Sequence, residues 1–225
     1  MGWMERLEAR ALSRQLDPRA NIFYFLRHGE TAENRARICQ GNNDVPLNDD
    51  GIAQAGRAAP VVASFPVKRA IASDLRRVRM TIAPILARSP VAHETTPALR
   101  ERGFGPRQGQ PIRADHWDAT DEGVESIEDF VDRICDCLQA RLVDDHVLVA
   151  AHGGVLRVIA AALAAPLQTW AYTNALPMVF RRENGHWRVE AVTADHRLDA
   201  FAPLPEGVTV GDPTTAADLT GAPAT

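Results

Sequence analysis

Two histidines that each precede a glycine are the residues of this sequence best suited to chemistry, and His28 is the first of them. It stands in the run Arg27-His28-Gly29-Glu30-Thr31. A neutral imidazole, with an ordinary pKa of about 6.5, can attack phosphorus and form a phosphohistidine. Gly29 has a carbonyl placed to hold the ring in one tautomer, and it has no side chain where the backbone must approach a ligand. We therefore predict that His28 is a nucleophile for phosphoryl transfer.

Phosphoryl transfer needs, above all, positive charge around the transferring oxygens. Arg27 and Arg77 can each supply a forked guanidinium, and each charge-assisted hydrogen bond contributes roughly 1.5 to 3 kcal/mol. The second histidine, His152, precedes Gly153 and Gly154, whose N–H groups would open a helix and add its dipole. Together these residues predict an anion cradle that works without a metal.

A metal site is the alternative for His28 and His152. The sequence has no H-E-x-x-H, no cysteine cluster and no other ligand spacing, so we expect neither a metal nor a cofactor. It also lacks the G-x-x-x-x-G-K-[ST] motif, which argues against a nucleotide-driven kinase. The other histidines have no matching neighbours and are interpreted as surface or packing residues: His93, His116, His146, His186 and His196.

The leaving oxygen of a phosphate ester needs a proton, which a carboxylic acid outside the cradle can supply. Glu101, in the run 99–105, is the candidate for this role. The same residue, once ionised, could take a proton from the water that attacks the phosphohistidine. The alternative is that Glu101 is only a solvated carboxylate in a charged loop.

Four arginines surround Glu101 in sequence although the net charge of the chain is −4: Arg100, Arg102, Arg107 and Arg113. Our hypothesis is that this loop, which should overhang the pocket, recognises a second anionic group on the substrate. A solvated basic surface is an equally good interpretation.

The elements that must position these residues alternate between strands and helices. Buried strands are predicted at 21–26, 67–73 and 147–151, and helices at about 50–64, 75–87, 126–138 and 153–165, before a late hairpin at 178–182 and 187–192. Such alternation predicts an α/β fold with a mainly parallel sheet covered by helices on both faces. Sites in these sheets lie beyond the carboxyl ends of the strands. Three strands should therefore bring Arg27-His28, the segment 73–77 and His152 to one rim.

The chain is predicted to form one domain, at 21–200, with a short lid at about 99–125. The preceding segment, 1–20, has helical spacing of apolar residues and is interpreted as a surface helix without a function. The segment 201–225 is rich in Pro, Gly, Ala and Thr, so it is expected to be loop or disordered.

Composition narrows the possible partners. A pI near 6 gives no general attraction for nucleic acid, and no stretch is long and apolar enough to cross a bilayer. The three cysteines form no C-x-x-C pair, and the first residues do not resemble a signal peptide. We expect a cytoplasmic protein that acts on a small phosphate ester. No pattern predicts an oligomeric state.

These motifs, taken in order, resemble the histidine phosphatase superfamily, the phosphoglycerate-mutase-like proteins. The resemblance covers about residues 21–200 and continues through the runs 40–55, 73–81, 99–105, 125–126 and 149–154. It implies a three-layer α/β/α sandwich, a phosphorylated nucleophile at His28, and phosphoryl binding by Arg27, Arg77 and His152. It further implies that Glu101 is the proton donor. Asn34, Gln40 and Gly41 would line the substrate pocket.

The resemblance is compatible with two reactions, hydrolysis and isomerisation. The glycolytic mutases of this superfamily have a longer insertion after the acidic residue, whereas only 106–123 separates it here from the next helix. A shorter lid should admit water, which favours a metal-independent phosphatase over a mutase. A phosphate-binding module without turnover is a further alternative. After Phe104-Gly105 the chain continues Pro106-Arg107-Gln108-Gly109, unlike many relatives, so its substrate is not predicted.

Overall fold

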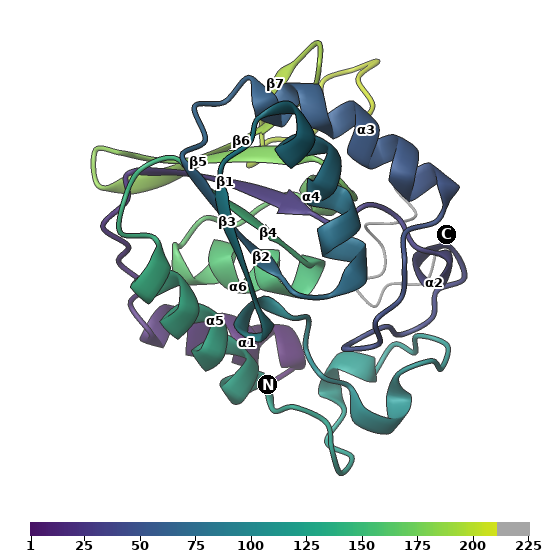
Figure 1. Cartoon of the computed structure of the whole chain (residues 1–225). Coiled ribbons are helices and arrows are strands. Elements are labelled where there is room, and N and C mark those ends of the chain that lie inside the picture. Colours follow the sequence, from purple (N-terminus) through teal and green to yellow (C-terminus); the bar gives the residue numbers. More distant parts are fainter. Residues whose placement is uncertain (211–225) are drawn as a thin grey trace.

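The computed structural model describes residues 1–210 as three layers, a central sheet with helices on both faces (Figure 1). The predicted tail at 211–225 lies outside the described residues. The sheet has seven strands in the order β3-β2-β4-β1-β5-β6-β7. Their bounds are β1 Ile22–Arg27, β2 Arg69–Ser73, β3 Ala92–Thr96, β4 Val147–Ala151, β5 Pro177–Glu183, β6 His186–Val192 and β7 Arg197–Asp199.

The first four strands of this order run parallel, and β5, β6 and β7 continue the sheet antiparallel. Strand β1 lies in the middle, parallel to β4 and antiparallel to β5. It is an apolar run buried almost throughout, as expected for a strand covered on both faces. The predicted α/β fold with a mostly parallel sheet is confirmed.

Helices α3 (Asp49–Ala63) and α4 (Arg76–Arg88) cover one face of the sheet, and α1 (Trp3–Ser13), α5 (Ile127–Arg141) and α6 (Gly153–Ala162) cover the other (Figure 1). Two of these helices begin at side-chain caps. Oδ1 of Asn48 accepts from the Gly51 N–H at 2.8 Å, and Oγ of Ser126 accepts from the Asp129 N–H at 2.9 Å. These caps satisfy N–H groups that a helix start leaves without partners.

Helix α1 is integrated into the core, which is a correction to the expected surface appendage. Trp3, Leu7 and Ala11 are buried with residues of α5 and α6 in the larger core cluster. Three arginines at i, i+4 spacing pair with α5: Arg6 with Glu128, Arg10 with Asp132 and Arg14 with Asp136. Because these pairs are partly exposed, each contributes only about 0.2–1 kcal/mol, and the buried apolar face is the main attachment.

The structure adds elements that the sequence patterns did not predict. Edge strand β3 has an exposed, polar sequence without alternation, and among residues 1–210 it pairs with β2 alone. Helix α2 (Ala32–Arg35) has a single turn. The lid contains two 3₁₀ turns, η2 (Gly105–Arg107) and η3 (His116–Asp118), and further 3₁₀ turns occur at η1 (Pro97–Leu99) and η4 (Thr169–Tyr172).

Within residues 1–210, no helix combines the length and the apolar character that spanning a membrane requires.

Candidate active site

Three parallel strands end at one rim of the sheet, as predicted. Arg27 at the end of β1 is in register with Ala151 at the end of β4, and Ala150 of β4 is in register with Ala72 of β2. The N–H of His28 donates to the Ala151 carbonyl at 3.0 Å. The rings of His28 and His152 therefore lie side by side, with centroids 5.2 Å apart.

The geometry of His28 is that of a neutral imidazole with one free nitrogen. Nδ1 lies 2.7 Å from the Gly29 carbonyl, which can only accept, so Nδ1 carries the hydrogen and Nε2 keeps its lone pair. Burial, with Arg77 and Arg27 nearby, lowers the pKa of His28 well below its usual 6.5. The nucleophilic form is thus the form present near neutral pH.

Gly29 is required by a backbone contact that the sequence did not predict, and its expected approach to a ligand stays a prediction. A Cβ at this position would lie 2.5 Å from the carbonyl oxygen of Gly51 in α3. The close approach is therefore between two stretches of backbone. The N–H of Gly29 also donates to Oγ1 of Thr81 at 2.9 Å, which ties the loop to α4.

His152 is held through Nε2, which lies 2.9 Å from Oγ of Ser73 at the end of β2. Its Nδ1 is buried and has no hydrogen-bond partner in the described structure. A buried polar atom without a partner is uncommon and fits a site whose ligand supplies the partner. Burial and the nearby charge of Arg77 lower the pKa of His152 as well.

Arg77 is 1% exposed, and two of its guanidinium nitrogens donate to backbone carbonyls. Nη1 donates to Asn43 at 2.7 Å and Nη2 to Gly41 at 2.8 Å, while buried Nε lacks a partner among residues 1–210. Burial lowers the pKa of Arg77 to about 10, so the guanidinium stays charged at neutral pH. Nη1 of Arg27 donates to the Tyr172 carbonyl at 2.5 Å.

The carboxylate of Glu101 lies against the start of α6. Oε2 accepts from the Gly154 N–H and Oε1 from the Arg102 N–H, both at 2.9 Å. A Cβ on Gly154 would overlap Oε1 of Glu101 and lie 3.0 Å from Cη2 of Trp117. The Gly154 N–H that was expected to serve the cradle thus holds the candidate acid.

A cavity of about 60 Å³ joins most of the predicted residues. Its lining includes Arg27, His28, Asn34, Gln40, Gly41, Arg77 and Glu101. It also includes residues that the sequence did not predict: Ile38, Cys39, Phe104, Ile112, His116 and Trp117. Three predicted residues, Gly29, His152 and Gly153, do not line this cavity, although the ring of His152 lies beside that of His28. Phosphate binding by these three residues stays a prediction.

A larger cavity, about 680 Å³, lies elsewhere, between α3 and strands β5 and β6. Neither His28 nor His152 lines it, but Asn174 does, and Nδ2 of Asn174 donates to the His28 carbonyl at 2.8 Å. Asn174 was missed because no motif in the sequence marks it. In the described part of the chain, no group of three or more His, Cys, Asp or Glu side chains could hold a metal.

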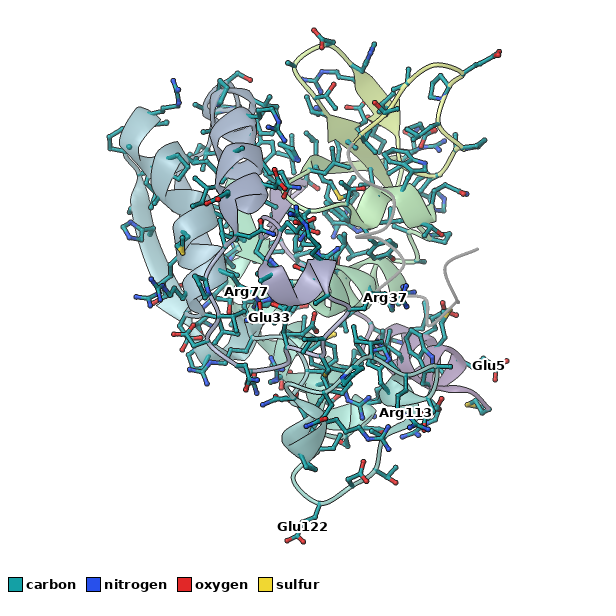
Figure 2. All side chains as sticks on the ribbon, turned by 90° about the vertical axis from the view of Figure 1, so that its right-hand side faces the viewer. Glu5, Glu33, Arg37, Arg77, Arg113 and Glu122 are labelled. Atoms are coloured by element: carbon teal, nitrogen blue, oxygen red, sulfur yellow. The ribbon has the colours of Figure 1, made fainter. Side chains whose placement is uncertain are left out.

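The lid arginines do not form the expected second anion site, because none of the four lines the described cavity. Arg100 pairs with Asp74 at 2.6 and 2.8 Å, and Arg107 pairs with Asp121 at 2.6 Å. Arg102 is buried and donates to the backbone carbonyls of Glu125, Trp117 and Ala119. Figure 2 shows Arg113 on the lid, well below Arg77.

The sequence model of the histidine phosphatase superfamily (branch 1) matches residues 23–195. An agropine synthesis reductase of Rhizobium rhizogenes is 32% identical over 178 residues, which is 75% of this chain and 41% of the reductase. The chain therefore spans about two fifths of that relative. The probable phosphatase C1687.21 of Schizosaccharomyces pombe is 32% identical over 60% of this chain and 70% of its own length.

Solved structures resemble the fold closely. A mycobacterial glucosyl-3-phosphoglycerate phosphatase, solved with VO3, has a TM-score of 0.61 and 25% identity, covering 78% of this chain and 100% of its own. The structure called mycobacterial hydrolase 1 has a TM-score of 0.63 and 27% identity, covering 77% of this chain and 98% of its own.

Proposed function

Because the chain belongs to the histidine phosphatase superfamily (branch 1), we propose that it hydrolyses a small phosphate monoester through a phosphohistidine on His28. The observation that carries this proposal is the state of His28: Nδ1–H is bound to the Gly29 carbonyl, which leaves the lone pair of Nε2 for attack. The unpartnered buried Nδ1 of His152 and Nε of Arg77 support a phosphoryl site beside it.

In the first step, the phosphoryl oxygens bind to Arg27, Arg77 and His152. The positive charge of the two arginines and the N–H donors of all three residues offset the charge of the transferring group. Nε2 of His28 then attacks phosphorus, so that an N–P bond forms and the P–O bond to the leaving group breaks. Glu101, in its protonated form, gives its proton to the leaving oxygen. The leaving group departs as an alcohol.

In the second step, the Glu101 carboxylate takes a proton from water while the water oxygen attacks phosphorus. The N–P bond breaks, and its electron pair returns to Nε2 of His28. Orthophosphate leaves, and Glu101 is again protonated for the next cycle. The hydrogen bonds from Gly154 and Arg102 hold the Glu101 carboxylate in place through both steps.

The test is hydrolysis of p-nitrophenyl phosphate by the purified protein in the presence of EDTA. We expect metal-independent turnover, its loss in His28→Ala, and its retention in His93→Ala, which changes an exposed histidine of β3. A mass increase of one phosphoryl group on the peptide that contains His28 should appear during turnover. Activity that EDTA removes would contradict the mechanism.

Isomerisation is the competing reaction, since a probable phosphoglycerate mutase GpmB of Yersinia pestis is 39% identical over 89 residues, 41% of that mutase. The short lid supports hydrolysis, because water reaches a phosphohistidine that no long insertion covers. Incubation with 3-phosphoglycerate and 2,3-bisphosphoglycerate should give little isomerisation. Interconversion faster than phosphate release would favour the mutase.

A further inference from the structure

One wall of the small cavity is aromatic and comes from the lid. This aromatic wall consists of Phe104, His116 and Trp117, all buried and all lining the cavity beside Glu101. The rings of Phe104 and Trp117 meet edge to face with centroids 5.4 Å apart, and His116 lies 5.3 Å from Phe104. These contacts fix the three rings relative to one another.

The aromatic wall carries no charge. Nδ1 of His116 lies 2.9 Å from the Arg113 carbonyl and so carries the hydrogen, and burial lowers the pKa of His116 to about 4. The guanidinium carbon of Arg102 lies 5.2 Å from the ring centre of Phe104 and 5.6 Å from that of Trp117, but Arg102 does not line the cavity, and its N–H groups donate to three backbone carbonyls. The other lining side chains on this side, Ile38 and Ile112, are apolar.

The support behind the wall comes from α1, outside the family match at 23–195. The indole of Trp3 stacks on that of Trp117 with centroids 4.8 Å apart and planes 21° apart. Trp3 is itself fixed, because it is 8% exposed and the guanidinium carbon of Arg157 lies 5.2 Å from its ring centre. In both figures the start of α1 lies beside the lid, near Glu5 in Figure 2.

We propose that α1 is part of the substrate site: Trp3 holds Trp117 in place, so that the aromatic wall binds an uncharged, apolar or aromatic leaving group next to the phosphoryl cradle. The inference rests on the proposed function, since it names the class of phosphate ester that the same site accepts. Trp3 is a positioning residue that acts through Trp117. A second anion on the leaving group would meet no cation among the wall residues that line the cavity and would lie near the Glu101 carboxylate.

The test compares the binding of orthophosphate, which occupies the cradle alone, with that of phenylphosphonate, which adds a ring for the wall. Wild type should bind phenylphosphonate at least tenfold more tightly, and a carboxylate added to the ring should weaken binding at least threefold. Trp3→Leu keeps an apolar side chain but removes the stack. It should lower the ratio of the two dissociation constants at least threefold, with orthophosphate affinity within twofold of wild type. Trp3→Phe should restore most of the ratio.

Leu7→Ala is the control for loosened docking of α1, because Leu7 is buried on the same helix. We expect it to lower the thermal midpoint without changing the ratio. An unchanged ratio in Trp3→Leu, an equal loss of both affinities, or the same effect in Leu7→Ala would overturn the inference. Binding needs no turnover, so a protein that shows the expected ratios but no hydrolysis would contradict the proposed function alone.

Discussion

Oγ of Ser73 lies 2.9 Å from Nε2 of His152, and the direction of this hydrogen bond sets which nitrogen of the imidazole carries the hydrogen. The Leu75 N–H approaches the same Oγ at 3.4 Å as a donor, so the hydroxyl is free to give its own hydrogen to Nε2. In that arrangement Nδ1 of His152 bears the hydrogen. The unpartnered Nδ1 then becomes a neutral donor for a phosphoryl oxygen.

Replacement of Ser73 tests this assignment. In Ser73→Ala, Nε2 loses the hydrogen bond that selects the tautomer, so the N–H at Nδ1 is present only part of the time. We expect kcat to fall roughly 10- to 100-fold, equivalent to about 1.4–2.7 kcal/mol of transition-state stabilisation. The measurement is steady-state kinetics with p-nitrophenyl phosphate. Ser73→Thr keeps the hydroxyl and should recover much of kcat; equal losses in both variants would mean that packing alone matters.

A substitution at Gly154 tests the role of Glu101, because the Gly154 N–H donates to the Glu101 carboxylate. In Gly154→Ala the new methyl group must displace the Glu101 carboxylate or Trp117, which already contact this position. Because an alkyl alcohol needs the proton more than p-nitrophenol does, kcat should fall more for alkyl phosphates, roughly 10- to 100-fold, than for p-nitrophenyl phosphate.

The matched control is Gly56→Ala at an exposed position of α3, where a Cβ has open space. It should leave the kinetics unchanged and stabilise the protein by about 0.5–1 kcal/mol, as alanine does in a helix interior. If Gly154→Ala slowed both kinds of substrate equally, Glu101 would not be the group that the methyl displaces.

The chemistry of the site was predictable where it follows apolar strands. His28 and His152 each directly follow a buried strand, and these two strands are parallel neighbours in the sheet. The two histidines therefore lie together, and the path of the connecting chain does not affect this. The sequence left two interpretations of the lid arginines open, because their partners are evident only in three dimensions: Arg100 pairs with Asp74, which lies on another segment. The stack of Trp3 on Trp117 joins segments far apart in sequence, and apolar spacing predicts a buried helix face without naming what it touches.

Asn174, which belongs to none of the sequence motifs, supports the loop that contains His28. Its Nδ2 donates to the His28 carbonyl at 2.8 Å, and the neighbouring Ala175 N–H donates to the Arg27 carbonyl at 3.1 Å. Asn174→Ala leaves a buried carbonyl without this partner, which should cost about 1–3 kcal/mol of unfolding free energy. We also expect a roughly tenfold lower kcat/KM because His28 loses its position. Urea denaturation and kinetics measure the two effects, and an unchanged kcat/KM would show that the loop keeps its geometry without Asn174.

Three buried histidines predict that the protein loses stability in mild acid. The pKa values of His28, His116 and His152 are lowered by burial, that of His116 to about 4. Below the ordinary value of 6.5 the unfolded chain therefore binds protons that the folded protein does not, and each such histidine removes up to about 1.4 kcal/mol of stability per pH unit. The unfolding free energy should be highest above pH 7 and should fall as the pH drops from 6.5 toward 5. Carboxylates with lowered pKa, such as Asp74, act in the same direction at lower pH, so this window isolates the histidines.

Urea denaturation at half-unit steps measures the slope, and His116→Phe should reduce it by about one third, whereas His93→Gln at an exposed position of β3 should not. A free energy that stays level between pH 7 and 5 would mean that the buried imidazoles protonate without opposition from the fold.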